Sequence, residues 1–396
     1  MARSTEALVE PDILRWARAS AGLSVDEAAR SLQTQPDRVQ AWEDGDEHPS
    51  MAQLRRMATA YRRLLSDFYL PKAPDEAPLP HDFRRMPGEV AFRYSKALRY
   101  HLRVARERRA LALDFAAELD IEVPQLTGRL QLNTDTERTG AELRRLLGVT
   151  PDMQLAWRDP RASYNGWRGA IERAGTLVFQ VAGVAPREIL GFSLPDRPLP
   201  VIGVNRKLAP NGRTFTLLHE SVHVYLGESS ICDIEEGELR PPEEQRVEVF
   251  CNAVAGAALV PRDALLNHPL VVRHPDRPRD WGDDELSSLA RDFGVARLVI
   301  LRRLLKFGRT TESFYGARHK AYGGLLDASA VTTTSEDDEY RRNVPQEVVS
   351  DLGRPFARLV LESYDNTFTS LSDVSRYLGL RAQKVDKLRA LLAVRS

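Results

Sequence analysis

Apolar residues in the first seventy positions recur at helical spacing and are separated by short polar segments. Four helices are expected, over 11–20, after Ser24, over about 36–44 and after Ser50. Ser24 and Glu27 have the spacing of a capping box, and residues 33–35 form a polar turn before the third helix. Two short helices joined by a tight turn, with supporting helices on either side, predict a helix-turn-helix domain over 1–70.

Beyond this domain the pattern changes to longer helices and a few short strands. Five prolines between 71 and 90 predict a semi-rigid linker. Helices are expected over about 92–119, 138–147, 164–174, 214–226, 243–259 and 284–307, the last interrupted at Gly294, and strands over about 176–181, 189–194 and 201–204. The polar segment 329–343 predicts a flexible linker, and a helical tail follows. The chain is therefore expected to be mainly α-helical with a small β-sheet.

One stretch of this tail repeats the rhythm of the N-terminal domain. The sequence LSDVSRYLGLRAQKVDKL near the C-terminus is spaced like LSVDEAARSLQTQPDRVQAW near the N-terminus. Two amphipathic helices with a tight turn are common in proteins that have no role on DNA. The echo alone therefore assigns no function.

Composition and charge exclude several classes of protein. Hydrophobic residues make up 42% and charged residues 28%, which are ordinary values for a globular protein. No apolar stretch is long enough to span a membrane, and the N-terminus lacks the pattern of a secretion signal. The cysteines are Cys232 and Cys251, too few for a disulfide scaffold. We expect a cytoplasmic protein that makes no contact with a membrane.

The strongest chemical motif is His219-Glu220-Ser221-Val222-His223. On a helix, residues at positions i and i+4 share one face, so both imidazoles can bind one metal ion. Zinc bound by two or three such ligands keeps a position open for water and lowers the pKa of that water. Glu220 is the candidate general base, and His219 and His223 are the candidate zinc ligands.

A third ligand must come from elsewhere in the chain. Leu226 and Ser229 stand where an extended metzincin motif would need glycine and histidine. The remaining candidates are downstream carboxylates, at Glu235, Glu236, Glu238, Glu243, Glu244 and Glu248. Glu248 lies in a segment that is apolar nearly all round, where a carboxylate needs a metal or a charged partner. We predict Glu248 as the ligand, and an ion pair with Arg246 or Arg213 is the alternative.

Three other residues near the motif are considered. Asn252 is polar within the same apolar segment and is a candidate to orient a ligand or a substrate backbone, or to bond within the core. Cys251 is expected to pack in the core. Cys232 lies in the acidic stretch 228–238, and the longer stretch 228–244 is a candidate lid over the site.

At these residues the sequence resembles the ImmA/IrrE family of metallopeptidases. The family pattern F-T-x-x-H-E-x-x-H stands here at 215–223. Its second part, E-x-x-x-N-x-x-A-x-x-x-L-x-P, stands at Glu248, Asn252, Ala255, Leu259 and Pro261. The N-terminal domain resembles Xre-type helix-turn-helix domains. Two departures are Ser221-Val222 in place of Leu-Gly, and Gln33 in the turn where glycine is usual.

The resemblance implies a zincin-like α+β peptidase core and a site-specific zinc endopeptidase that acts in the cytoplasm. Its implied substrate is a helix-turn-helix repressor or an antitoxin-like partner, whose cleavage switches gene expression. The expected organisation is a helix-turn-helix domain (1–70), a Pro-rich linker (71–90), a metallopeptidase domain (91–270), a helical helix-turn-helix-like subdomain (271–327), a flexible linker (328–343) and a C-terminal helical region (344–396).

Whether the N-terminal domain binds DNA is left open by its charge. Residues 1–70 carry nine basic and eleven acidic residues, a net charge of −2, whereas DNA binding depends on neutralising phosphates. Arg38 and Gln40 could read base edges, or the domain could recognise a similar helix-turn-helix in a protein partner.

Basic charge is concentrated elsewhere, over 93–109 and 297–320, with +6 in each. These clusters could contact nucleic acid, or they could pair with acidic residues of the same chain. The alternative function is a DNA-binding transcription regulator with a structural or sensory zinc site, and a homodimer is also considered.

Overall fold

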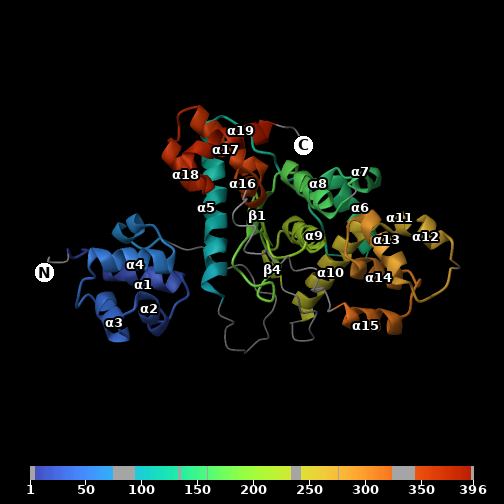
Figure 1. Cartoon of the computed structure of the whole chain (residues 1–396), viewed down its shortest axis with the longest axis horizontal. Helices are drawn as coiled ribbons and strands as arrows, with labels where there is room; N and C mark the ends of the chain where they lie inside the picture. Colours follow the sequence, from blue (N-terminus) through green and yellow to red (C-terminus); the bar gives the residue numbers. More distant parts are fainter. Residues whose placement is uncertain are drawn as a thin grey trace. The chain divides into compact units, whose positions relative to one another are not determined.

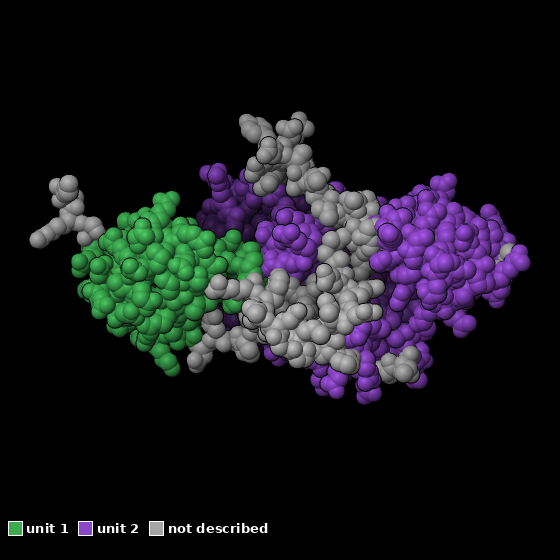
Figure 2. All heavy atoms as spheres, turned by 90° about the horizontal axis from the view of Figure 1, so that it is seen from below, with its two compact units in different colours: residues 1–79, 89–104 green, residues 80–88, 105–396 purple. Residues whose placement is uncertain are grey.

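The computed structural model describes residues 5–74, 94–132, 135–157, 159–232, 242–274, 276–322 and 344–393. They form two compact units, Met1–Leu79 with Glu89–Val104, and Pro80–Gly88 with Ala105–Ser396 (Figure 2). Most of the linkers predicted over 71–90 and 328–343 lies outside the described residues. No helix in the described part of the chain has the length and apolar content needed to cross a membrane.

The first unit contains the predicted helix-turn-helix. Its helices are α1 Pro11–Ser20, α2 Val25–Leu32, α3 Pro36–Asp44 and α4 Met51–Tyr61, followed by the 3-10 helix η1 Leu65–Tyr69. The predicted capping box is confirmed, because the Ser24 hydroxyl accepts from the Glu27 N–H while the Glu27 carboxylate accepts from the Ser24 N–H. Gln33 ends α2 with φ 55°, so the turn does adopt the left-handed conformation without glycine.

A buried ion pair joins α1 to α3 in this unit. Nε of Arg18 lies 2.7 Å from Oε1 of Glu43, and Nη2 lies 2.7 Å from Oε2. The Glu43 side chain is only 3% exposed. Glu43 is therefore part of the core, although it is one of the eleven acids counted over residues 1–70. Its partner Arg18 is in the same count, so the net charge of −2 is unchanged.

The long helix α5, Lys96–Glu118, begins four residues later than predicted and belongs to both units. Its first turns pack in the first unit, where the Lys96 ammonium donates to the Ala60 carbonyl. Its later turns pack in the second unit, where the Arg109 guanidinium donates to the Leu199 carbonyl.

The second unit is built on a four-stranded sheet with the order β1-β3-β2-β4. The strands are β1 Leu177–Val181, β2 Gly191–Leu194, β3 Val201–Asn205 and β4 Ser230–Cys232. β1 runs parallel to β3, whereas β2 is antiparallel to both β3 and β4. Three strands lie where the sequence predicts them, and β4 was not predicted.

Helices supply the rest of this unit (Figure 1), which confirms the expected mainly α fold with a small sheet. They are α6 Thr136–Leu147, α7 Pro151–Ala156, α8 Pro160–Arg173, α9 Pro210–Leu226, α10 Pro242–Leu259, α11 Arg262–Leu266, α12 Pro269–Val272, α13 Asp283–Phe293, α14 Arg297–Lys306 and α15 Glu312–Ala321. α9 packs against α8, α10 and the sheet, and α10 also packs against α6. α8 begins earlier than the predicted 164, because Asp159 caps it and Pro160 occupies its first turn.

The C-terminal helices are α16 Val344–Leu352, α17 Arg354–Asp365, α18 Leu371–Leu378 and α19 Val385–Ala393, with a 3-10 turn η4 Ala382–Lys384 before α19. α16 packs against β1, where the Gln180 amide donates to the Ser350 hydroxyl over 3.0 Å. The buried Arg168 guanidinium, paired with Glu172, donates to the carbonyls of Val178 and Ser350. These bonds attach the C-terminal region to the sheet.

The ion pair of the first unit gives a stability prediction. Replacing Glu43 with alanine leaves the Arg18 charge partly buried without its carboxylate, which is expected to cost about 3 kcal/mol. Asp44→Ala is the matched control, because its side chain is 45% exposed and its loss is expected to cost less than about 1 kcal/mol. The measurement is urea unfolding of both variants, and equal destabilisation would contradict the burial argument.

Candidate metal centre

The two histidines of the motif lie side by side on α9. Pro210 opens the helix, and Gly227 ends it with φ 84° one turn after His223. Nε2 of His219 and Nε2 of His223 are 3.1 Å apart. Their side chains are 5% and 0% exposed, so both imidazoles face the interior. The i, i+4 spacing therefore places two nitrogen donors together as predicted.

Glu248 reaches the same point from α10. Its Oε1 lies 3.1 Å from Nε2 of His223, and its Oε2 lies 3.4 Å from Nε2 of His219. Of the alternative partners, Arg213 stacks over the ring of Tyr164 and Arg246 is exposed. The candidates Glu235, Glu236 and Glu238 lie outside the described residues, as does much of the predicted lid over 228–244.

The separations between these donors fit a tetrahedral zinc ion. Ligand atoms about 2.0–2.1 Å from zinc stand roughly 3.3 Å from one another in a tetrahedron. The three closest contacts in the cluster are 3.1, 3.1 and 3.4 Å, and all three side chains supply atoms that lie within 4.8 Å of one another. His219, His223 and Glu248 would therefore hold the metal.

The electrostatics of the cluster also favour a cation. Burial raises the pKa of Glu248, but attraction to His219 and His223 and hydrogen bonds with them hold that pKa well below its ordinary value. Burial lowers the pKa of His219, but Glu248 outweighs it and the pKa is raised. The pocket therefore stabilises positive charge between these groups, which is what a divalent ion supplies.

Asn252 contacts the outer nitrogen of one imidazole. Its Oδ1 lies 2.9 Å from Nδ1 of His219. Because an amide oxygen only accepts, Nδ1 of His219 carries the proton and its Nε2 presents a lone pair to the centre. Among the roles considered for Asn252, this contact fits that of orienting a ligand, here the imidazole of His219.

Glu220 lies beside the cluster and is fully buried. Its Oε2 accepts a hydrogen bond from the Ser230 hydroxyl over 2.6 Å, and the Ser230 hydroxyl is 2.9 Å from that of Ser193. Among the described residues, no donor reaches the other oxygen, Oε1. A buried carboxylate oxygen without a donor is costly.

The sequence did not reveal the residues that surround Glu220. Ser230 belongs to the unpredicted strand β4, and Ser193 lies on β2, so their contact depends on sheet pairing. A Cβ at Gly191 would lie 3.1 Å from Oε1 of Glu220 and 2.9 Å from the Gly203 carbonyl. Glycine is thus required there for the sheet to pass close to the carboxylate.

The departures from the family pattern are accommodated within the core. The Ser221 hydroxyl donates to the Leu217 carbonyl over 2.7 Å, so it is satisfied without a partner outside the helix. Val222 is buried among the apolar residues around α9, and Cys251 is a buried free thiol in the same cluster. Burial raises the pKa of Cys251, which is consistent with the packing role predicted for it.

The candidate base-reading residues of the first unit are engaged with acidic neighbours. The Gln40 amide lies 3.0 Å from both oxygens of Asp44. Nε of Arg38 lies 3.6 Å from Glu47, and its guanidinium stacks over Trp42. Both residues are exposed on α3, but their polar groups contact carboxylates of their own domain.

Part of the basic charge over 297–320 is also paired within the chain. Arg303 and Lys306 both contact Glu137, and Arg309 contacts Asp276. Arg318 lies 3.1 Å from Asp283. These four basic residues are therefore paired with acidic residues of the same chain.

Comparison with known families supports the resemblance drawn from the motifs. Residues 172–305 match the peptidase family model described as the IrrE N-terminal-like domain, and residues 12–66 match a model described as a helix-turn-helix domain. This is the predicted combination of an ImmA/IrrE-type peptidase with an N-terminal helix-turn-helix. A search of curated proteins found no match.

The contact between Asn252 and His219 gives a prediction about metal affinity. Asn252→Ala removes the acceptor that fixes the tautomer of His219, and zinc affinity is expected to fall about 10- to 100-fold. Asn252→Asp keeps an acceptor oxygen and is expected to bind zinc at least as tightly as the wild type. Competition with a chromophoric chelator measures both, and wild-type affinity in Asn252→Ala would contradict the assignment.

Proposed function

Because residues 172–305 match the model of the IrrE N-terminal-like peptidase domain, we propose that the chain is a zinc endopeptidase that acts in the cytoplasm. The observation that carries the proposal is the convergence of His219, His223 and Glu248, with the buried Glu220 carboxylate beside them. The described residues supply three protein donors to this cluster, whereas structural zinc sites use four. A three-donor centre favours catalysis over the alternative structural or sensory role.

In the proposed reaction, His219, His223 and Glu248 would hold the zinc ion, which would supply a Lewis acid that makes water nucleophilic near neutral pH. Glu220 accepts the proton of the attacking water at Oε1 and later donates it to the departing amine. The Ser230 hydroxyl donates to Oε2 and thereby leaves Oε1 as the proton acceptor. Asn252 keeps the His219 ring in the orientation that binds the metal.

The proposed substrate is a helix-turn-helix repressor or an antitoxin-like partner, whose site-specific cleavage changes gene expression. The chain itself carries a helix-turn-helix domain, and similar domains can pair with one another. The net charge of −2 over residues 1–70 and the contacts of Arg38 and Gln40 with carboxylates favour protein recognition by this domain. The same pairing could join two copies of the chain as a homodimer.

The general base is tested by Glu220→Gln, which keeps the size of the side chain but cannot accept a proton from water. This variant is expected to retain zinc and to cleave at least about 1,000-fold more slowly. The assay incubates each protein with small helix-turn-helix proteins encoded beside its gene and follows fragments by intact mass. Glu118→Gln, an exposed acid on α5 outside the candidate lid, is the control and should cleave at the wild-type rate.

Two outcomes separate the parts of the proposal. Cleavage by Glu220→Gln at the wild-type rate would show that Glu220 is not the base. A zinc-loaded wild type that cuts a generic unfolded protein but none of the helix-turn-helix partners would contradict the substrate class and leave the peptidase assignment in place.

The third ligand is tested by Glu248→Ala. Removing a buried carboxylate that touches both imidazoles is expected to abolish stoichiometric zinc binding after dialysis. Glu243→Ala, on the exposed first turn of α10, should retain the metal. Elemental analysis measures both variants, and full zinc content in Glu248→Ala would overturn the ligand assignment.

A further inference from the structure

The C-terminal helices α18 and α19 repeat the local geometry of α2 and α3. Ser370 caps α18 as Ser24 caps α2, and in each case the carboxylate three residues later accepts from the N–H of the cap. In the C-terminal copy the two bonds join Ser370 to Asp373, at 3.1 and 3.2 Å. The sequence echo is therefore a repeated capping structure.

The turn that follows is also repeated. The left-handed residue stands nine positions after the cap in both copies, at Gln33 with φ 55° and at Gly379 with φ 62°. The second helix starts three positions later, at Pro36 in the first unit and with the 3-10 turn Ala382–Lys384 in the C-terminal copy. The two turns therefore set the same spacing between their helices.

Buried positions coincide as well. Val39 and Trp42 lie fifteen and eighteen residues after the first cap, and Val385 and Leu388 lie at the same offsets from the second, with all four side chains in a core. α17 packs against both α18 and α19. Residues 370–393 thus repeat the spacing and the buried positions of the helix-turn-helix at 24–47.

The outward face of its second helix is exposed and basic. Gln383, Lys387 and Ala390 are exposed and lie opposite the buried Val385 and Leu388. Arg381, Lys384 and Lys387 form no ion pair with any residue in the described part of the chain. One acid, Asp386, shares this face, and it lies 3.8 Å from Nη1 of Arg389.

The two copies of the helix-turn-helix differ in net charge. The 24 residues from Ser24 hold two basic and seven acidic residues, a net charge of −5, or −4 without the buried Glu43. The 24 residues from Ser370 hold five basic and two acidic residues, a net charge of +3. Because affinity for DNA depends on neutralising phosphates, the C-terminal copy is the one suited to a nucleic acid.

We propose that the helix-turn-helix at 370–393 binds duplex DNA. The N-terminal part of the second helix enters the major groove, where the Gln383 amide is placed to meet base edges. Arg381, Lys384 and Lys387 supply the contacts to phosphates or guanines. The exposed Ala390 lets the helix approach the groove closely, and the peptidase centre takes no part in this binding.

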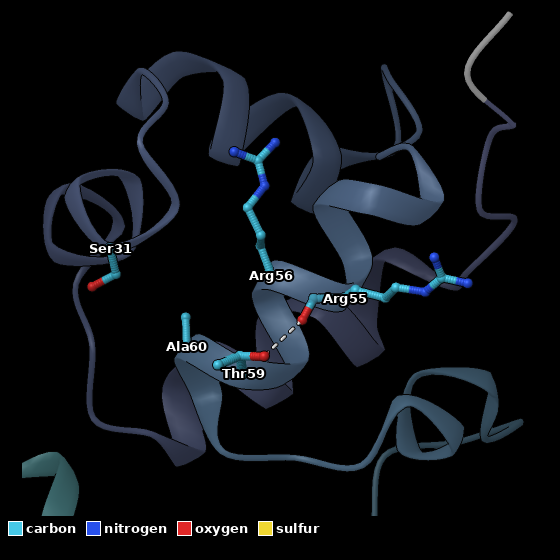
Figure 3. Close-up of a pocket in the computed structure, with 5 residues that line it drawn as sticks. All are labelled: Ser31, Arg55, Arg56, Thr59 and Ala60. Carbon is cyan, nitrogen blue, oxygen red and sulfur yellow. Dashed lines mark hydrogen bonds between the residues drawn. The ribbon is translucent and has the colours of Figure 1, made fainter. Parts of the chain in front are cut away.

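A pocket in the first unit is the competing site for an anion. It has a volume of about 340 Å³ and is lined by Ser31, Arg55, Arg56, Thr59 and Ala60 (Figure 3). The two hydroxyls already donate to the carbonyls of Glu27 and Arg55, and Figure 3 shows the two guanidinium groups pointing in different directions. Arg55 and Arg56 therefore belong to the matched control in the DNA-binding test.

The test measures fluorescence anisotropy of the full chain with a labelled 30-base-pair duplex of mixed sequence, between 50 and 200 mM salt. The triple variant Arg381→Ala, Lys384→Ala, Lys387→Ala is expected to bind more than ten-fold more weakly at 100 mM salt. The slope of log K against log salt should fall by about 2–3, as expected when three phosphate contacts are lost. The control triple combines the two pocket arginines with Arg30, an exposed basic residue of α2. This triple, Arg30→Ala, Arg55→Ala, Arg56→Ala, should change the affinity less than two-fold.

A further variant separates base reading from charge. Gln383→Ala keeps every charge and should leave the salt slope unchanged, while it weakens binding to a duplex selected from a random pool by about ten-fold or more. Unchanged urea unfolding checks that each variant remains folded.

Three results would overturn the proposal. The first is no binding of the wild type to the duplex at 50 mM salt. The second is loss of binding in the control triple instead of the C-terminal triple. The third is an equal effect of the C-terminal triple on a single strand of the same length, which would indicate a general polyanion surface.

Discussion

The candidate metal centre depends on α9 and α10, which hold two imidazoles and a carboxylate at one buried point. Each of these groups alone would be costly to bury, and together they compensate one another and favour a cation between them. α9 is fixed by α8 and the sheet, and α10 is fixed by α6. The approach of α6 to α10 is so close that a Cβ at Gly140 would lie 2.7 Å from that of Ala257. Small displacements of either helix would therefore change the donor separations.

The sheet serves this centre through its last strand. β4 supplies Ser230, which binds one oxygen of Glu220, and β2 supplies the glycine that lets the carboxylate lie against the sheet. Thus the groups expected to bind metal come from helices, whereas those that position the proposed base come from strands.

The two helix-turn-helix segments share one backbone geometry but differ in charge, because acidic residues predominate in one and basic residues in the other. Charge on the exposed faces, more than the fold, distinguishes their proposed partners.

What the sequence predicted correctly rests on local interactions. The helices over 11–20 and 36–44, and the box between Ser24 and Glu27, depend on contacts within a few residues. Glu248 was predicted as the third ligand because its neighbours in sequence are apolar. In the structure it does lie beside both histidines. Contacts between distant segments were missed. The pairing of Glu43 with Arg18 joins two helices, and that of Ser230 with Glu220 requires a strand of three residues with no sequence signature of its own.

We expect zinc to bind at His219, His223 and Glu248 with a position left open for water. X-ray absorption at the zinc edge of the full chain, loaded with one equivalent of metal, measures the atoms around the ion directly. The expected result is a set of nitrogen and oxygen ligands at about 2.0–2.1 Å, with scattering from two imidazoles and no sulfur. Sulfur at about 2.3 Å would make a cysteine a zinc ligand and would contradict this assignment.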